Sequence, residues 1–431
     1  MRKKIHIITM GCSKNLVDSE RLMRQLAAAG YQVKHEGPVG KVFCVIINTC
    51  GFIHDAREES VNMILECVEA RKKGRIELLY VMGCLSQRYR EELLSEIPEV
   101  DQYFGARDIR EVLEALQLHA REDLMGERVL TTPAHYSYLK IAEGCDRTCA
   151  FCSIPLIRGP HVSRPLEEIT SEARYLASQG VKELLVISQD ITYYGYDRYR
   201  KSALAELIRQ LCRIEGPDWV RLHYTYPRNF PLEVLDLMNS EPKLCHYLDI
   251  PVQHISDPVL QAMRRNITRE QTLQLLREIR RRVPGIALRT TLLVGHPGET
   301  EDDFRQLLDF VQEMRFERLG VFTYSHEEGT HAGLNYRDDI PSDVKAERAA
   351  RIMELQRAIS EDHNQRRVGS VFRVLIDRQE GDFFVGRTQY DSPEVDNEVL
   401  IPVDPGTRVG SFCDVRITSA TEYDLFGALV S

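Results

Sequence analysis

Residues 143–152 read EGCDRTCAFC and place Cys145, Cys149 and Cys152 in the spacing C-x3-C-x2-C. A closed structural zinc site normally takes four protein ligands, and no fourth Cys or His follows at finger spacing. Three thiolates in a short loop instead suit three corners of a 4Fe–4S cubane, with one iron left open to an outside ligand. The alternative is three cysteines that meet by chance in a buried core, which such tight spacing disfavours.

The segments around this loop alternate strand and helix patterns. Six apolar strand candidates follow one another, most of them with a helical segment behind, such as residues 166–178 or 302–314. Six βα units in a row predict a partial (β/α)6 barrel of TIM type, with ligands at the carboxyl ends of its strands. The cysteine loop comes directly after the first of these strands. The six candidates are residues 138–142, 183–187, 220–224, 247–252, 287–294 and 318–323.

A second set of cysteines, Cys12, Cys50 and Cys84, lies in the first hundred residues. Each follows a short apolar run that precedes a helical pattern, so we expect a small doubly wound parallel α/β domain. The carboxyl ends of parallel strands share one edge of a sheet, so the three thiols can converge into a second cluster site. The runs are residues 5–10, 42–47 and 78–82, and the first two helices are expected at 17–29 and 55–73. The remaining cysteines lie within strand or helix patterns and are interpreted as buried thiols: Cys44, Cys67, Cys212, Cys245 and Cys413.

The last part of the chain has a different pattern. A charged helix is expected over 342–366 as a connector, and five short strands with turn residues follow, which is typical of an OB-like β-barrel. The strands are expected at 371–377, 383–387, 398–402, 414–418 and 424–430. The sequence thus predicts an α/β multidomain protein with modules at 1–130, 131–366 and 367–431.

Composition excludes several classes of protein. Of 431 residues, 43% are hydrophobic and 28% charged, which is typical of a globular enzyme and not of a disordered or fibrous chain. No apolar stretch approaches the ~20 residues of a membrane span. The apolar part of the first ten residues is too short for a signal peptide, so we expect a cytoplasmic protein. In the reducing cytoplasm, the eleven cysteines are expected to be metal ligands, catalytic groups or buried thiols, not disulfides.

The cysteine loop, with an aromatic residue before its last cysteine, resembles the radical S-adenosylmethionine superfamily. In that family the open iron binds S-adenosylmethionine, and an electron from the cluster cleaves it to a 5′-deoxyadenosyl radical. The resemblance implies that Cys145, Cys149 and Cys152 hold the cluster. It also implies that Phe151 lies near the cofactor.

The later stretch LVGHPGET at 293–300 resembles a strand-to-helix turn of the same superfamily. The resemblance implies that Gly295 and Gly298 let the backbone approach the cofactor. By itself the turn could equally be an ordinary loop, with Glu299 as an acidic residue at the start of a helix.

The three expected modules together resemble the methylthiotransferase family over essentially the whole chain, and the last module is called TRAM in that family. The resemblance implies two 4Fe–4S clusters, of which the one at Cys12, Cys50 and Cys84 holds the sulfur or methylthio group. One S-adenosylmethionine supplies the methyl group and another the radical, which removes hydrogen from an unactivated carbon. An alternative of another class is a non-enzymatic iron–sulfur electron carrier, which three ligands per cluster disfavour.

The wording of the motifs favours one branch of this family, which modifies the β-carbon of an aspartate in small-subunit ribosomal protein S-twelve. Residues 11–20 read GCSKNLVDSE and 48–60 read NTCGFIHDAREES, while 249–254 and 257–265 read DIPVQH and DPVLQAMRR. All resemble that branch. The tRNA branch usually has Gln-Met-Asn after its first cysteine, so a tRNA adenosine 2-methylthiotransferase is the alternative within the family.

Charge supplies an independent argument about the partner. The net charge is −9, and residues 369–431 hold five arginines, no lysine and eleven acidic residues, a net of −6. Such a module would repel phosphates and suits a basic ribosomal protein, so we expect no tRNA partner; the alternative is an ordinary solvated surface. The run Asp391, Glu394, Asp396 and Glu398 is expected to be exposed. A reducing electron donor is a further expected partner, and no membrane is expected.

Overall fold

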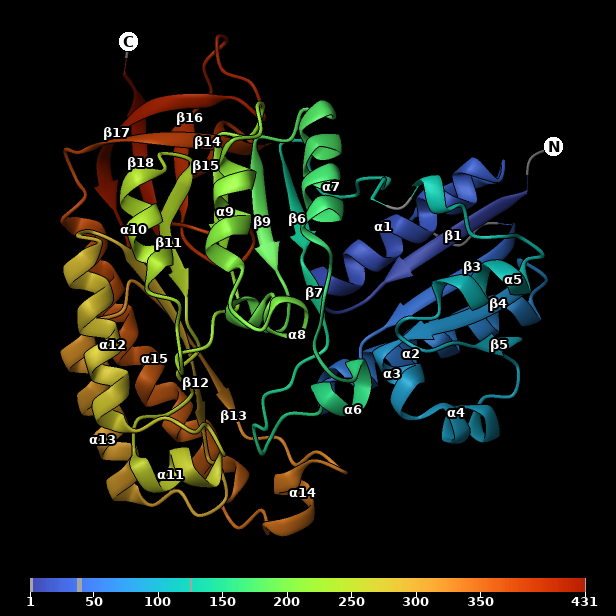
Figure 1. The fold of residues 1–431 in the computed structure, drawn as a ribbon, viewed down its shortest axis with the longest axis horizontal. Coiled ribbons are helices and arrows are strands. Elements are labelled where there is room, and N and C mark those ends of the chain that lie inside the picture. Colours follow the sequence, from blue (N-terminus) through green and yellow to red (C-terminus); the bar gives the residue numbers. More distant parts are fainter. Residues whose placement is uncertain (1–2, 37–40, 125, 431) are drawn as a thin grey trace.

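The computed structural model describes residues 3–36, 41–124 and 126–430 (Figure 1). Besides a two-stranded ribbon, it contains a five-stranded sheet, a six-stranded sheet and a closed five-stranded barrel. In Figure 1 the first sheet lies at the right, the second in the centre and the barrel at the upper left. Among the described residues, no helix is long and apolar enough to cross a lipid bilayer. The expected α/β multidomain class is confirmed.

The first sheet is parallel throughout and contains the three expected strands plus two short edge strands. Its elements are β1 (Lys4–Thr9), α1 (Ser13–Ala28), β2 (Gln32–His35), β3 (Val42–Thr49), α2 (His54–Lys72), β4 (Ile76–Gly83), α3 (Cys84–Arg88), α4 (Arg90–Glu96), β5 (Gln102–Tyr103) and α5 (Ile109–Ala115). The strand order is β2-β1-β3-β4-β5. α1 and α5 cover one face, and α2 and α4 cover the other. The edge strands β2 and β5 are too short or too polar to show as strands in the sequence.

The six-stranded sheet is also parallel, and its two edge strands do not pair with each other. Its strands are β6 (Tyr136–Lys140), β9 (Glu183–Ile187), β10 (Trp219–Leu222), β11 (Leu244–Asp249), β12 (Ala287–Val294) and β13 (Arg318–Thr323). The order β13-β12-β11-β10-β9-β6 confirms the partial barrel. The expected strands at 138–142, 220–224 and 247–252 begin one to three residues earlier than predicted. Directly after β6, β7 (Ala142–Glu143) pairs with β8 (Val162–Ser163).

Helices cover the outer face of this sheet. Leucine, isoleucine and valine side chains from alternate strand positions pack beneath them in one large apolar core. The opposite face carries larger and more polar side chains, including Tyr138, Arg221 and Tyr247. The helical segments are α6 (Ile154–Arg158), α7 (Leu166–Ser178), η2 (Ile191–Tyr193), α8 (Tyr196–Tyr199), α9 (Leu204–Cys212), α10 (Glu233–Ser240), α11 (Asp257–Ala262), α12 (Arg269–Arg282), α13 (Glu301–Met314) and α14 (His331–Asn335).

The connector helix and the terminal barrel are both present. α15 (Ser342–Gln365) packs against β13 and α13 and leads into five strands, which close in the order β14-β15-β16-β18-β17. The strands are β14 (Val371–Glu380), β15 (Phe383–Thr388), β16 (Glu398–Pro402), β17 (Phe412–Ala420) and β18 (Asp424–Leu429). A small apolar core that includes Val374, Phe384 and Val415 fills the barrel.

The acidic run between β15 and β16 is not exposed as expected. Asp391 is fully buried and accepts hydrogen bonds from Arg318, at the start of β13. The side chain of Asp396 is also buried, and its carboxylate accepts a hydrogen bond from Tyr247 Oη at 2.8 Å. The prediction failed because the loop docks against the amino ends of the six-stranded sheet, where arginines neutralise its carboxylates. Glu394 alone of the four remains exposed, and Glu398 is half-buried.

Candidate active site

Three cysteines meet at the carboxyl edge of the first sheet. Cys12 precedes α1, Cys50 follows β3, and Cys84 opens α3 directly after β4. The thiols lie near enough to influence one another electrostatically. A Cβ atom on Gly11 would lie only 2.7 Å from Cys50 Cβ, and Gly11 has the left-handed φ of +88°. Only glycine therefore lets β1 end this close to the second cysteine.

Asn15 ties the strand ends of this edge together. Its buried Nδ2 donates to the Met10 carbonyl at 2.9 Å and to the Thr49 carbonyl at 3.0 Å. Asn48 Nδ2 donates back to the Asn15 carbonyl at 2.9 Å. The first turn of α1 is thereby fastened to the ends of β1 and β3, which fixes the relative positions of the cysteines that follow them.

The second triad lies in the loop between β7 and α6. Cys145, Cys149 and Cys152 are all half-buried. The Cys145 amide donates to the Gly159 carbonyl at 3.1 Å, which closes the loop. A Cβ atom on Gly144, whose φ is +74°, would lie 2.5 Å from that same carbonyl oxygen. Glycine before the first cysteine is thus a steric requirement of this loop.

Cationic and aromatic groups surround the middle cysteine of this loop. Arg265 Nη1 donates to Cys149 Sγ at 3.3 Å, and Tyr226 Oη lies 3.9 Å from the same sulfur. The guanidinium groups of Arg265 and Arg147 both lie 4.2 Å from the Tyr226 ring centroid. Arg147 also donates to Asp190 at 2.7 Å, which holds it in place. Arg265 and Tyr226 thereby fix the position of Cys149 Sγ.

Each triad offers three thiols, a donor set that suits a 4Fe–4S cubane with one iron open to an outside ligand. Among the described residues, no three Cys, His, Asp or Glu side chains are placed to share one metal ion. Burial raises the pKa of Cys84 to about 11 and that of Cys145 to about 12. Binding of a metal by such thiols would release their protons.

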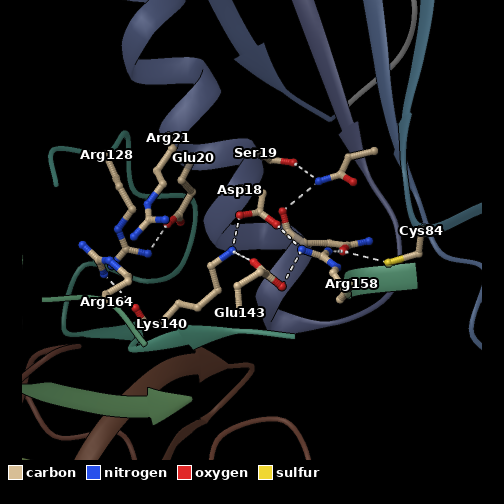
Figure 2. Close-up of polar contacts among 12 residues, drawn as sticks. Asp18, Ser19, Glu20, Arg21, Cys84, Arg128, Lys140, Glu143, Arg158 and Arg164 are labelled. Atoms are coloured by element: carbon tan, nitrogen blue, oxygen red, sulfur yellow. Dashed lines mark hydrogen bonds and ion pairs between the residues drawn. The ribbon is translucent and has the colours of Figure 1, made fainter. Parts of the chain in front are cut away.

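The loops that carry the two triads touch each other. Ser153 Oγ, directly after the last cysteine of its loop, donates to the Phe52 carbonyl at 3.4 Å. Arg158 donates to Asn15 Oδ1 and lies beside Cys84 (Figure 2). The cysteines of the first sheet and those of the six-stranded sheet therefore belong to one composite site.

A buried ion network holds this composite site together (Figure 2). Lys140, on β6, donates to Asp18 of α1 and to Glu143 at 2.7 Å. Arg158 donates to the same two carboxylates at 2.9 and 3.1 Å. Burial alone would raise the pKa of Glu143, but Lys140 and Arg158 hold it well below its usual range. All four groups are thus paired with one another where the first sheet meets the cysteine loop.

Comparison with known proteins gives this arrangement a family. The radical SAM superfamily matches residues 139–311, the TRAM domain residues 368–430, and an uncharacterised family, UPF0004, residues 4–105. A protein of Flavobacterium johnsoniae named ribosomal protein uS12 methylthiotransferase RimO is 56% identical over 430 residues, 99% of this chain and 98% of its own. The chain belongs to the RimO family. Membership of the radical SAM superfamily implies a 4Fe–4S cluster and S-adenosylmethionine as cofactors.

A further relative belongs to the same family, and a solved structure shares the fold. A RimO protein of Parabacteroides distasonis is 54% identical over 432 residues, covering 100% of both chains. Among solved structures, the radical S-adenosylmethionine methyltransferase TsrM from Kitasatospora setae, with cobalamin and a 4Fe–4S cluster bound, has a TM-score of 0.55 at 15% identity. That match covers 77% of each chain and shows a shared fold only.

The turn between β12 and α13 of this RimO family member differs in part from expectation. Gly295 has a φ of +74°, and a Cβ atom there would meet the Lys345 side chain; Gly298 has a φ of +81° with open space around it. Thr300 is the N-cap of α13. Glu299 points inward instead, and its carboxylate accepts a hydrogen bond from the Gly295 amide at 2.8 Å. The interpretation of Glu299 as an acid at the helix start is therefore wrong.

Phe151 is half-buried and packs against an apolar group that includes Met263, Leu293 and Tyr324. We expect Phe151→Ala to weaken S-adenosylmethionine binding while lowering the free energy of unfolding by about 1–2 kcal/mol, less than the ~3–5 kcal/mol of a fully buried ring. Equilibrium dialysis and thermal melting measure the two effects. Phe304→Ala, at a fully buried position of α13, is the control for pure loss of core packing. A large stability loss with unchanged cofactor affinity would contradict the expectation.

A second contact clasps the first sheet's helices to the six-stranded sheet. Glu327, which follows β13, is 2% exposed. Arg57 of α2 donates to its carboxylate, and Arg88 at the end of α3 donates to the same oxygen at 2.8 Å. Because Arg57 and Arg88 each follow a cysteine of the first triad closely in sequence, this clasp fixes that triad over the barrel.

We expect Glu327→Gln to weaken this contact and to lower the free energy of unfolding by about 1–3 kcal/mol, because hydrogen bonds to a charged carboxylate are lost. Hydrogen exchange should then become faster at residues 324–330 and 84–89. Glu328→Gln changes an exposed neighbour and is the matched control. Equal protection in both variants would show that the clasp contributes nothing.

Sequence reasoning did not single out Asn15, Glu143, Arg158 or Glu327. The first two could have been found by position, because each lies within three residues of a cysteine of a triad. The other two left no local signal, since the partners of Arg158 on α1 and of Glu327 on α2 lie more than a hundred residues away.

Proposed function

We propose that this RimO family member transfers a methylthio group to the β-carbon of an aspartate in ribosomal protein uS12. The observation that carries the proposal is the composite site, in which two cysteine triads from two sheets meet through the contact of Ser153 with Phe52. A reaction that needs both a radical and a sulfur source requires two such centres side by side. The names of the full-length relatives in Flavobacterium and Parabacteroides support the same substrate.

Two 4Fe–4S clusters are the proposed metal groups, held by Cys145, Cys149 and Cys152 and by Cys12, Cys50 and Cys84. When bound, these groups supply the electron that cleaves S-adenosylmethionine to a 5′-deoxyadenosyl radical and a carrier for the sulfur. The chain's own residues hold the geometry: Arg265 and Tyr226 fix the sulfur of Cys149, and Asn15 fixes the strand ends of the other triad. Arg158 holds the two sites against each other through its hydrogen bonds to Asp18 and Asn15 of α1.

Phe151, Gly295 and Gly298 are proposed to contact S-adenosylmethionine. Their arrangement supports this, because Phe151 packs against Leu293, two residues before Gly295, at the carboxyl end of β12. Gly298 leaves open space for a ligand at the same turn. Close approach of a backbone to a cofactor is a common use of glycine.

A basic protein substrate is favoured over tRNA by the charge of the terminal barrel. Residues 369–431 carry a net charge of −6, and Asp382, Asp404 and Asp414 are exposed. Nucleic-acid binding depends on cations that neutralise phosphates, so this surface opposes it. Since Asp391 and Asp396 are buried against arginines, the attraction of a basic protein rests on the exposed acids and not on that run.

Further parts of the proposal follow from the reaction. A reducing electron donor must supply the electron, and a ribosomal protein substrate places the chain in the cytoplasm. We divide the chain into an N-terminal methylthiotransferase module at 1–130, a radical barrel with its connector at 131–366 and a TRAM module at 367–431.

The test is mass spectrometry of ribosomal proteins from a strain that lacks the gene, with and without the gene restored. We expect one aspartate of uS12 to lose a methylthio group in the deletion strain and to regain it on restoration. A methylthio group lost from tRNA adenosine, with uS12 unchanged, would replace the proposal by the tRNA reaction. Failure of reconstituted protein with dithionite and S-adenosylmethionine to form 5′-deoxyadenosine would favour an electron carrier.

A further inference from the structure

Lys14 is a largely buried residue whose cation has no anionic partner. The residue is 8% exposed, and within residues 3–36, 41–124 and 126–430 its side chain forms no ion pair and donates no hydrogen bond. Its Nζ lies 3.1 Å from the centroid of the Tyr224 ring. Lys140, which is 3% exposed, is instead paired with two carboxylates. The ammonium of Lys14 is therefore available to an acceptor from outside the chain.

The position of Lys14 is where a substrate must lie. Lys14 is in the first turn of α1, two residues after Cys12. The following residues Leu16 and Val17 pack against Tyr138 and Ile187 on the inner face of the six-stranded sheet. Lys14 therefore stands between the first triad and the carboxyl ends of the barrel strands, where barrels of this type bind their ligands.

Tyr224, whose ring contacts Lys14, has a strained backbone conformation. Tyr224 follows β10 with a φ of +60°, which is rare for a tyrosine. Its amide donates to Asp249 Oδ2 at 3.0 Å, and its carbonyl accepts from the Ile191 amide at 3.1 Å. Strain of this kind, maintained by hydrogen bonds on both sides, is concentrated at functional sites.

The surroundings of Lys14 favour an anion. The start of α1 has no side-chain cap and no acidic residue in its first turn, so the positive end of the helix dipole is not neutralised. Burial and the charges of Arg221, Arg289 and Lys14 lower the pKa of neighbouring His223 well below its usual range. The cation that lies beside Cys84 is Arg158, so Lys14 is not needed to balance that thiol.

We propose that Lys14 binds the side-chain carboxylate of the substrate aspartate and so selects an acidic residue for modification. This inference rests on the proposed function. In aspartate the β-carbon is bonded directly to the carboxylate carbon, so a fixed ammonium that binds the carboxylate also places the reacting carbon. Lys14 thus acts as the specificity-determining residue between the two triads.

The test measures the affinity of the full chain, reconstituted with iron and sulfide, for two ligands. One is purified uS12, and the other is uS12 with asparagine at the target position. We expect the unchanged chain to bind the aspartate form about 10- to 100-fold more tightly, as for a charge-assisted hydrogen bond. Lys14→Met should bind both forms equally, and Lys14→Arg should keep the preference. Lys3→Met is the matched control, because Lys3 also lies over an aromatic ring, that of Phe43, but outside the site.

Each outcome has a distinct meaning. If Lys14→Met keeps full iron content and still prefers the aspartate form, the inference is wrong while the proposed function stands. If the unchanged chain neither binds nor modifies uS12, the proposed function itself is wrong. Should Lys14→Met fail to fold, loss of the preference in Lys14→Arg, with iron retained, would overturn the inference in its place.

Discussion

Alanine at Cys145, Cys149 and Cys152 together is expected to abolish cleavage of S-adenosylmethionine and to leave about half of the iron, because each triad is proposed to bind one of two clusters. Alanine at the other triad should also leave about half of the iron but should preserve cleavage and abolish methylthiolation. Iron analysis, 5′-deoxyadenosine formation and mass spectrometry of uS12 measure the three quantities. This other triad, the first along the chain, comprises Cys12, Cys50 and Cys84.

A matched control is available for both triple variants. Cys44, Cys67 and Cys212 are buried within strands or helices, and their replacement by alanine should leave the iron content unchanged. Full iron retention in either triad variant would contradict the assignment of two clusters. Loss of cleavage in both triad variants would mean that the centres are not independent.

Arg128→Met is expected to lower the free energy of unfolding by about 3–5 kcal/mol, because it leaves buried carboxylates without their partner. Arg128 is fully buried and lies 3.0 Å from Glu20 of α1 (Figure 2). It also lies 3.1 Å from Glu172 of α7. It also donates to the Tyr138 carbonyl at 2.6 Å, and so joins the first sheet to the second. Urea unfolding followed by fluorescence of Trp219, the only tryptophan, measures the change.

Two controls separate charge from packing in that experiment. Arg121→Met breaks an exposed pair with Asp123 and should leave the free energy of unfolding almost unchanged, because solvent screens such a pair. The double variant Glu20→Gln with Arg128→Met should recover part of the loss, because it removes a charge from each side. A single variant as stable as the unchanged chain would show that the network carries no stability.

Much of the fold was predictable because its signals are local. Apolar runs marked β1, β3, β4 and the six barrel strands, and short strands with turns marked the terminal barrel. The start of α1 was missed: it begins at Ser13 and not at Val17, because hydrogen bonds of Asn15 to two strand ends hold a polar first turn in helical form. Hydrophobic periodicity cannot predict such hydrogen bonds.

In the candidate site, too, only the features with local signals could be predicted from the sequence. Cysteine spacing and position at strand ends pointed to both triads, which the structure brings together. The ion pairs that hold the triads against each other join residues more than a hundred positions apart, such as Arg158 with Asp18 and Arg57 with Glu327. Turn composition also predicted exposure of Asp391, whereas an arginine of another module buries it. Local patterns cannot report a partner that only the tertiary fold supplies.

The docked loop between β15 and β16 has a consequence for the order in which the protein matures. Arg221, Arg289 and Arg318 line the base of the radical barrel, and their acceptors include the Gln389 carbonyl, Asp396 and Asp391 respectively. During translation these arginines emerge from the ribosome long before those acceptors do. Until nearly the whole chain has been synthesised, these arginines lack acceptors that the finished fold supplies, and the base of the barrel lacks its cover. We therefore expect stable folding of the radical barrel to depend on completion of the polypeptide.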